Sequence, residues 1–395
     1  MKNIINSLVN NKRLPLILFV TAIILFSANI GGMSIYMLDE AKNSECAREM
    51  LEQKDFVVPT FNYELRTDKP PLHYYFMMAS YKIFGVNEFG ARFFSAVFGA
   101  LTVLITFLYS RRFINKETGL WAAIVLIASI HMVLQFHLAV PDPYLVFFFC
   151  WTLFLFIAAY KDRKTWEVYL FYAAAGLGVL AKGPVVVAIP GLAILVFLIM
   201  KKQLNWQTIK FFRPWFGILL LLAICLPWYI KVGLDTNWEW TKGFFFQHNL
   251  GRFTGEMEGH GGIFLITPGY IILGLFPFSA FIIQAVAKGW KERENDFLFF
   301  NWIAALSIVL FFTVSKTKLP NYTVPAYPFF ATLLGSYLVS LFTKSKSEKE
   351  TGIKASNWFL LIFSILVPVG AYIAFSLDES LLPVRNVAFL LLILP

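Results

Sequence analysis

The sequence predicts an all-α protein, a polytopic bundle of transmembrane helices with further helices lying on its outer surface. Two observations lead to this prediction. Of the 395 residues, 58% are hydrophobic and only 15% are charged, and the mean hydropathy is +0.65. Long segments without Asp, Glu, Lys or Arg recur along the whole chain. Such a composition is typical of an integral membrane protein and excludes a soluble domain.

The uncharged segments are long enough to cross a bilayer, which takes about 20 mostly apolar residues, or fewer where aromatic or uncharged polar groups flank the segment. On this basis we expect eleven spans, at residues 14–38, 93–110, 118–141, 143–160, 168–181, 183–200, 214–230, 259–287, 297–315, 319–343 and 355–377. A twelfth begins near Asn386, and the sequence ends at Pro395 before this segment could cross the membrane. We therefore expect a further C-terminal part, soluble or membrane-embedded, in the whole protein.

The basic N-terminal segment, residues 1–13, precedes the first span without an evident cleavage site, so we interpret it as an uncleaved signal anchor. We therefore place the N-terminus in the cytoplasm. Alternating the spans from there puts six segments inside, and these contain 20 of the 34 Lys and Arg residues, whereas four short outer loops contain four. The positive-inside rule predicts this bias. The excess of basic residues is thus topological, and we expect no nucleic-acid partner.

Two long hydrophilic segments, residues 39–92 and 231–258, both emerge on the outer face under this topology. In the first, residues 43–53 place apolar side chains at helical spacing with charged residues between them. This pattern predicts an amphipathic helix at the membrane interface. Residues 72–84 are aromatic and apolar and predict a second interfacial helix.

The chain between these two helices is expected to be extended and then sharply turned. Residues 56–62 contain Pro59 and are predicted to be extended. Lys69-Pro70-Pro71 cannot continue a helix, because proline lacks the amide proton and restricts the residue before it. We therefore expect Lys69 to lie on a stiff turn at the membrane surface.

Titratable groups also recur at the outer ends of later spans. They occur at Asp142, at Lys182, in the stretch 247–260 and in the stretch 315–322. At any one of these positions a solvated or snorkelling anchor is the more common explanation. Their joint occurrence on one side of the membrane, in six separate segments, favours a single cavity.

Such a cavity would combine carboxylates and a histidine with several cations, namely Asp39, Asp68 and His248 with Lys42, Lys69, Lys182, Arg252 and Lys316. This combination suits a phosphate leaving group held by Lys and Arg, together with a carboxylate that orients or deprotonates an attacking group. If Asp39 and Asp68 meet His248, the three suit a divalent ion such as zinc, magnesium or manganese. A metal-free hydrogen-bond network, or an ion pair between the neighbours Asp68 and Lys69, is the alternative.

Several function classes are disfavoured by motifs that the sequence lacks. It contains no Asp-x-Asp and no phosphate-binding loop of the Gly-x-x-x-x-Gly-Lys-Ser/Thr type, so we expect no nucleotide as donor or cofactor. The three cysteines, Cys46, Cys150 and Cys225, are widely spaced, which argues against a disulfide framework or a cysteine metal site. The apolar spans lack acidic residues, which disfavours a transporter without excluding it.

The outer residues resemble a known family, the bacterial lipid A aminoarabinose transferases. These belong to the GT-C membrane glycosyltransferases and are related to protein O-mannosyltransferases. The family's first-loop motifs stand here as Asp39-Glu40, Ala47-Arg48-Glu49-Met50, Lys69-Pro70-Pro71-Leu72, Asn87-Glu88-Phe89 and Ala91-Arg92. Later family positions stand as Asp142, Lys182-Gly183-Pro184, His248-Asn249, Arg252-Phe253, Gly259-His260 and Lys318-Leu319-Pro320-Asn321-Tyr322. The resemblance extends to about residue 345.

The resemblance implies a GT-C fold, a sugar donor carried on a polyprenyl phosphate, and transfer with inversion at the anomeric carbon. It implies catalytic roles for Asp39, Lys69 and Asp142. It further implies that Lys69 holds the donor phosphate and that Asp68 and His248 are candidate metal ligands. As our own hypothesis, we add donor-phosphate contacts from Lys42, Arg252, Lys316 and Tyr322.

The chain departs from the family pattern at three positions of the first outer segment. It has Lys42 where arginine is common, Asp68 where glutamate is common, and Arg66 where an aromatic residue is common. Lysine cannot make the bidentate contact to phosphate that arginine makes, so the departure at Lys42 weakens the expected grip on the donor.

We therefore expect a multi-pass glycosyltransferase of the bacterial inner membrane, with its active site facing the periplasm. Its partners would be membrane lipids, a polyprenyl-phosphate sugar and a lipid A-like or protein acceptor. The alternatives are an enzyme of the protein O-mannosyltransferase type and a flippase or transporter of lipid-linked sugars. Residues 1–345 would form the transmembrane core, and residues 346–395 would add further spans before a missing C-terminal domain.

Overall fold

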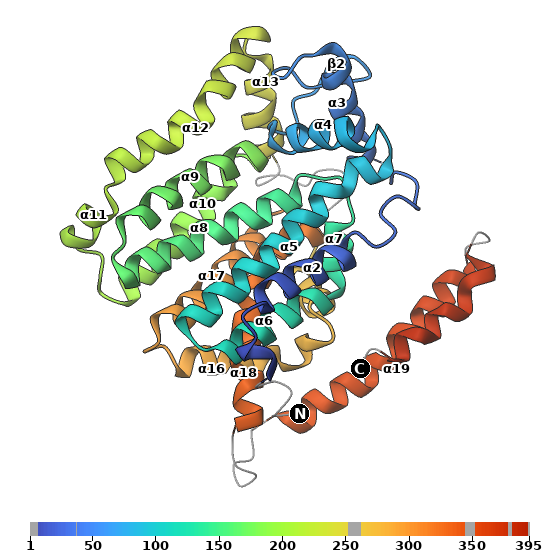
Figure 1. The fold of residues 1–395 in the computed structure, drawn as a ribbon, viewed down its shortest axis with the longest axis vertical. Helices are drawn as coiled ribbons and strands as arrows, with labels where there is room; N and C mark the ends of the chain where they lie inside the picture. The colour runs from blue at the N-terminus through green and yellow to red at the C-terminus, as the bar shows by residue number, and fades with distance from the viewer. Residues whose placement is uncertain (1–6, 37, 252–261, 344–351, 378–380, 394–395) are drawn as a thin grey trace.

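The computed structural model describes residues 7–36, 38–251, 262–343, 352–377 and 381–393. Within these residues the regular structure is helical apart from two strands of two residues each, β1 (Thr60–Phe61) and β2 (Glu64–Leu65), which pair antiparallel. The predicted all-α class is confirmed. Figure 1 shows the helices packed side by side, with α3, α4, β2 and α13 gathered at one end of the molecule.

Six helical stretches in the described residues are long and apolar enough to cross a membrane. They are α5 (Glu88–Phe113), α8 (Asp142–Asp162), Trp206–Asp235, α17 (Asp296–Val314), Pro320–Phe342 and α19 (Ile353–Leu377). The third consists of α11 (Trp206–Phe212) and α12 (Pro214–Asp235), and the fifth of η3 (Pro320–Ala326) and most of α18 (Tyr327–Thr343). The chain is thus a multi-pass membrane protein, as its composition predicted.

Two predicted spans, 118–141 and 259–287, are bent rather than continuous. The first divides into α6 (Lys116–Ala128) and α7 (Ile130–Phe136), which meet at 65°. The second divides into α15 (Ile266–Gly274) and the stretch of η2 (Phe278–Phe281) and α16 (Ile282–Lys291), which meet at 116°.

Local chemistry accounts for both bends. Ser129 is extended at ψ 125°, and its hydroxyl donates to the Val125 carbonyl at 2.5 Å, which competes with the helical backbone pattern. Pro277 lies between α15 and η2, and it has no amide proton with which to continue the first helix. Hydropathy alone does not register either effect.

The remaining predicted spans correspond to shorter helices, α2 (Leu14–Phe26), α9 (Thr165–Lys182) and α10 (Val185–Met200). The first of them was predicted to continue to residue 38. It ends at Phe26, and the chain that follows is not helical, since Asn29 has a φ of +59°. Buried Arg92 donates to the carbonyls of this segment, to Ile30 and Met33 at 2.6 Å and to Ser34 at 2.9 Å. These carbonyl groups therefore have partners without a helix.

The centre of the bundle is α8, whose residues are almost all buried and whose aromatic side chains contact α5 and α17. By contrast, α19 buries few residues and extends away from the bundle in Figure 1. Its first turns contact the bundle, since Gln284 donates to Ser356 at 2.8 Å and Ser356 donates to the Ala280 carbonyl at 2.6 Å. The predicted twelfth helix corresponds to η4 (Leu382–Ile393), a 3-10 helix beside α19. The predicted boundary at 345 lies outside the described residues.

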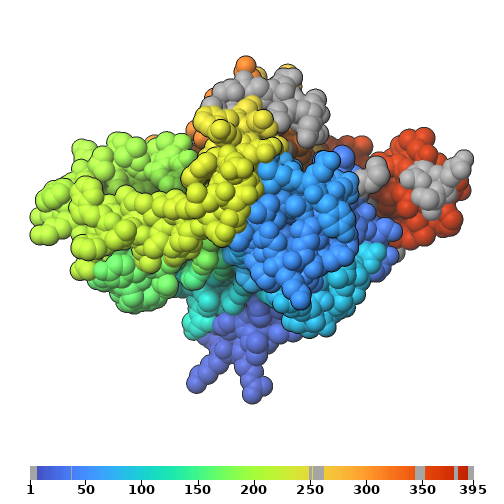
Figure 2. Space-filling view, turned by 90° about the horizontal axis from the view of Figure 1, so that it is seen from above, coloured from blue at the N-terminus to red at the C-terminus, as the bar shows by residue number. Residues whose placement is uncertain are grey.

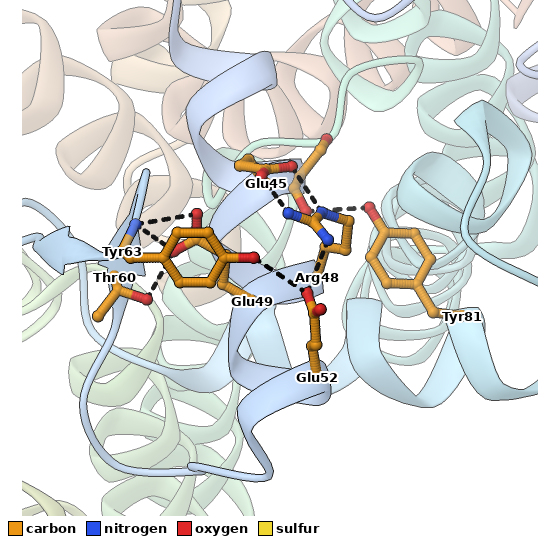
Figure 3. A network of polar contacts seen from close by, with 8 residues as sticks. Glu45, Arg48, Glu49, Glu52, Thr60, Tyr63 and Tyr81 are labelled. Carbon is orange, nitrogen blue, oxygen red and sulfur yellow. Dashed lines mark hydrogen bonds and ion pairs between the residues drawn. The ribbon is translucent and has the colours of Figure 1, made fainter.

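Both predicted outer helices are present, as α3 (Asp39–Gln53), which begins four residues before the predicted start, and α4 (Leu72–Phe84). The β1–β2 hairpin between them is tied to α3 by Glu49, which is fully buried. Glu49 accepts hydrogen bonds from the Thr60 hydroxyl at 2.6 Å and from the Tyr63 amide at 3.1 Å, as Figure 3 shows. The chain leaves this fixed hairpin directly into the turn that contains Asp68 and Lys69.

The second outer segment follows α12 and comprises α13 (Glu239–Lys242) and the π-helix η1 (Gly243–Gly251). Figure 2 shows this segment side by side with the first outer segment on one face of the molecule. Their approach is close, because a Cβ atom on Gly243 would lie 2.7 Å from the Thr67 hydroxyl oxygen. The fold thus brings two segments that are far apart in the sequence to one place.

Candidate active site

A cavity of about 390 Å³ lies where the outer segments meet the ends of several spans. Its walls come from the turn after β2, the start of α8, the junction of α9 and α10, η1, the end of α17 and η3. Charged and polar side chains line it together with apolar ones. The polar ones are Asp68, Lys69, Asp142, Lys182, His248, Ser315, Asn321 and Tyr322, and the apolar ones include Leu145, Val185, Ala188, Phe311 and Phe312.

The first polar group of the cavity is centred on Asp142, at the first position of α8. Its Oδ1 accepts hydrogen bonds from Lys182 at 2.5 Å and from the Asn321 amide at 2.9 Å. The side chain is buried, and Oδ2 has no hydrogen-bond partner among the described residues. The carboxylate is therefore held in one orientation with one acceptor oxygen left for a ligand.

The second polar group is formed by Asp68 and His248, which come from the two outer segments. His248 Nε2 lies 2.8 Å from Asp68 Oδ1, and the Arg66 Nε atom lies 3.4 Å from Asp68 Oδ2. Burial raises the pKa of Asp68, but the hydrogen bond from His248 and the charges of Arg66 and Lys69 outweigh it and hold that pKa well below its usual range. Asp68 is consequently a carboxylate at neutral pH.

Asp39 lies beside this group, in the first turn of α3, and its side chain is 51% exposed. Its Oδ2 is 3.9 Å from Lys69 Nζ and its Oδ1 is 3.8 Å from Arg66 Nη2. The positive end of the α3 dipole also favours the ionised form of a carboxylate at this position. Lys69 is buried and lines the cavity, so it connects Asp39 to the cavity wall.

The position of Asp39 is fixed by its neighbour Glu40. Glu40 is buried and forms a two-point ion pair with Arg92, at 2.7 and 2.8 Å. It also accepts hydrogen bonds from the amides of Tyr36 and Ala139, each at 2.7 Å. These contacts tie the start of α3 to α5 and to the chain before α8.

The junction of α9 and α10 is shaped by Gly183, directly after Lys182. Its φ of +93° favours glycine, and a Cβ atom there would lie 2.5 Å from the Phe244 ring. A larger residue would therefore displace Phe244, which lines the cavity, or strain the chain next to Lys182.

The cavity thus brings together six of the residues that the sequence placed on the outer face, Asp68, Lys69, Asp142, Lys182, His248 and Tyr322. Three other predicted site residues do not line it. Asp39 lies beside it, 3.9 Å from Lys69 Nζ, while Lys42 is half-buried on α3 and Lys316 is exposed. Arg252 and the predicted Gly259-His260 positions lie outside the described residues. The roles of all these residues remain predictions.

Two residues at the site had no assigned role in the sequence analysis. Asn321 binds Asp142 across 179 positions of sequence, and only its position in the outer stretch 315–322 pointed to the site. Arg66 was noted only as a departure from a family pattern. The signal that could have found it is a basic residue two positions before Asp68 in a loop that carries other candidate residues.

The predicted metal ligands are Asp68 and His248. Among the described residues, no group of three or more His, Cys, Asp or Glu side chains is arranged to hold a metal ion. Of the predicted ions, zinc usually has three or four protein ligands, whereas magnesium needs only one or two carboxylates with free oxygens. Because the guanidinium of Arg66 also lies against the Asp68 carboxylate, these residues do not fit a resident divalent ion.

Comparison with known proteins gives three findings. Residues 68–230 match the family described as dolichyl-phosphate-mannose-protein mannosyltransferase. The chain is 30% identical over 330 residues to an uncharacterised protein of Aquifex aeolicus (strain VF5), covering 83% of this chain and 74% of that protein. It is 26% identical over 369 residues to the undecaprenyl phosphate-alpha-4-amino-4-deoxy-L-arabinose arabinosyl transferase of Enterobacter sp. (strain 638), covering 90% of this chain and 65% of that transferase.

The fold is similar to that of a solved enzyme, ArnT from Cupriavidus metallidurans bound to undecaprenyl phosphate. The TM-score is 0.81 at 22% sequence identity, over 97% of this chain and 70% of that one. The predicted GT-C architecture is therefore confirmed. By its sequence matches, the chain belongs to the aminoarabinose transferase-like family of GT-C membrane glycosyltransferases.

Proposed function

We propose that this protein transfers a sugar from a polyprenyl-phosphate donor to an acceptor at the membrane surface. The observation that carries the proposal is the composition of the cavity. The cavity is lined by two cations, Lys69 and Lys182, and also by apolar side chains that include Val185 and Phe312. A phosphate joined to an isoprenoid chain needs both kinds of surface.

In the proposed reaction, an acceptor oxygen attacks the anomeric carbon of the donor sugar. A bond forms between that oxygen and the anomeric carbon, while the bond from this carbon to the phosphate oxygen breaks with inversion. The Asp39 carboxylate takes the proton of the acceptor O–H group, and polyprenyl phosphate leaves with the electron pair. The charge that develops on the phosphate is stabilised by Lys69 and by Tyr322, which lines the same cavity.

Asp142 has a separate part in this scheme. Its Oδ1 is occupied by Lys182 and Asn321, whereas its buried Oδ2 has no partner among the described residues. A sugar hydroxyl bound in the cavity would supply the missing donor. Asp142 would therefore orient the sugar rather than take part in proton transfer.

The resemblance and the relatives suggest two candidate acceptors. The Enterobacter relative is an arabinosyl transferase, and this chain spans 65% of its length. A lipid A-like acceptor is the first candidate, because the outer-face motifs resemble those of the lipid A aminoarabinose transferases. A protein acceptor is the second, favoured by the match of residues 68–230 to the protein mannosyltransferase family. The bias of Lys and Arg residues supports a location in the bacterial inner membrane, with the cavity facing the periplasm.

Mass spectrometry of cell lipids and glycoproteins tests the proposal, in strains that carry the wild type, Lys69→Met or no copy of the gene. Lys82→Met is the matched control, because Lys82 is an exposed lysine on the neighbouring α4. We expect a sugar increment on lipid A in the wild type and in Lys82→Met, and its loss in Lys69→Met. An increment only on protease-sensitive material would favour the protein acceptor. Movement of a lipid-linked sugar across the membrane without a new linkage would refute the transferase.

A further inference from the structure

Arg66 is a buried cation that lies beside the carboxylates of both Asp39 and Asp68. Its residue is 5% exposed, its Nε lies 3.4 Å from Asp68 Oδ2, and its Nη2 lies 3.8 Å from Asp39 Oδ1. The guanidinium therefore bridges the predicted metal ligand and the predicted catalytic carboxylate.

The surroundings of Arg66 keep this cation in place. Its backbone amide donates to the Pro59 carbonyl at 3.0 Å, at the end of the hairpin that Glu49 ties to α3. Both terminal nitrogens are buried, and neither has a hydrogen-bond partner among the described residues. Unpaired buried donors are costly unless a ligand satisfies them, and a bound anion would do so.

A fixed guanidinium at this position has a direct consequence for metal binding. A divalent ion on Asp68 and His248 would lie close to a positive charge that cannot move into water. The repulsion between the divalent ion and the guanidinium is twice that between two unit charges at the same distance, and a partly buried site screens it poorly. The same guanidinium also occupies one side of the carboxylate that the ion would need.

We propose that Arg66 takes the place of a divalent metal ion in this site, so that the protein works with a fixed organic cation and binds no metal. Arginine stays protonated at every accessible pH and provides a planar set of donors for phosphate or carboxylate oxygens. It supplies a positive charge beside the Asp39 and Asp68 carboxylates and beside the anionic donor. The identity of that donor rests on the proposed function, whereas the absence of metal binding does not.

Metal binding is measured without turnover, on the whole chain purified in detergent without chelators. We would determine zinc and manganese content by elemental mass spectrometry, and Mn²⁺ affinity from the electron paramagnetic resonance signal of the free ion. The neutral variant is Arg66→Gln, and the charged control is Arg66→Lys. We expect far less than one metal ion per chain in the wild type, and Mn²⁺ binding about 100-fold tighter in Arg66→Gln but not in Arg66→Lys.

One metal ion per wild-type chain, lost in His248→Ala, would overturn the proposal, as would equal Mn²⁺ affinity in the wild type and in a folded Arg66→Gln. If Arg66→Gln does not fold, the wild-type metal content and its His248→Ala comparison still decide the question. Transfer in the presence of EDTA is a separate measurement. If no sugar transfer is found with any donor, the proposed function fails while the metal result stands.

Discussion

Replacing Arg92 by methionine tests how the start of α3, which carries Asp39, is held in place. The guanidinium makes five hydrogen bonds in the interior, two to Glu40 and one each to the carbonyls of Ile30, Met33 and Ser34. Arg92 is 4% exposed and Glu40 is 1% exposed. The variant leaves Glu40 as a buried charge without its cation and leaves three carbonyls without a donor.

Breaking a buried ion pair by removing one partner costs about 3–5 kcal/mol, because the other charge stays uncompensated. We expect a loss of that size in the free energy of unfolding, measured by equilibrium unfolding in mixed micelles. Transfer activity should fall as well, because Asp39 adjoins Glu40 in the chain.

Arg48→Met is the matched control for this variant. Arg48 also pairs with two glutamates, Glu45 at 2.6 Å and Glu52 at 2.7 Å, as Figure 3 shows, but it lies on the surface with 35% of its side chain exposed. Exposed pairs contribute about 0.2–1 kcal/mol, so this variant should be nearly as stable as the wild type. Equal stability losses in Arg92→Met and Arg48→Met would refute the reasoning.

Three further predictions follow from the same contacts. Gly183→Ala should destabilise the chain by about 1–3 kcal/mol and weaken donor binding, because Gly183 has a φ of +93° and the Phe244 ring lies close to it. Gly191→Ala is the control, since Gly191 has open space around it, and it should do neither. Unfolding experiments and donor titrations compare the two variants. Burial raises the pKa of Cys46 to about 12, so its thiol is protonated at pH 8 and iodoacetamide should label it only after unfolding, as peptide mass mapping will show. A cysteine at the exposed Tyr63 should react with an impermeant maleimide in intact spheroplasts, and labelling only after lysis would place the site in the cytoplasm.

Much of the fold could be predicted because transmembrane helices follow from the length and spacing of uncharged segments. Each of the eleven predicted segments contains helix in the structure. What hydropathy missed depends on single contacts. The segment after α2 was predicted to be helical, but it is bound by Arg92, which donates to the Ile30 carbonyl from 62 positions further along the chain. The bend between α6 and α7 follows from one hydroxyl, that of Ser129.

The candidate site was predictable to a smaller extent. Topology placed Asp68, Asp142, Lys182 and His248 on the outer face, and the structure brings them to one cavity. Which of them pair could not be predicted, since Asp142 binds Lys182 and Asn321 from distant segments. Arg66 shows the limit most clearly, because a charged residue in a loop is usually solvated, and only the packing of the hairpin buries this one.

The central claim is that Asp39 and Lys69 carry out sugar transfer from a polyprenyl-phosphate donor. The most direct test is single-turnover transfer by the purified protein, with the donor labelled in its sugar and with wild type, Asp39→Asn, Lys69→Met and Lys82→Met compared. The account predicts that the rate falls by about 100-fold or more in each of the first two variants and is unchanged in Lys82→Met. Full-rate transfer by a folded Asp39→Asn variant would contradict it.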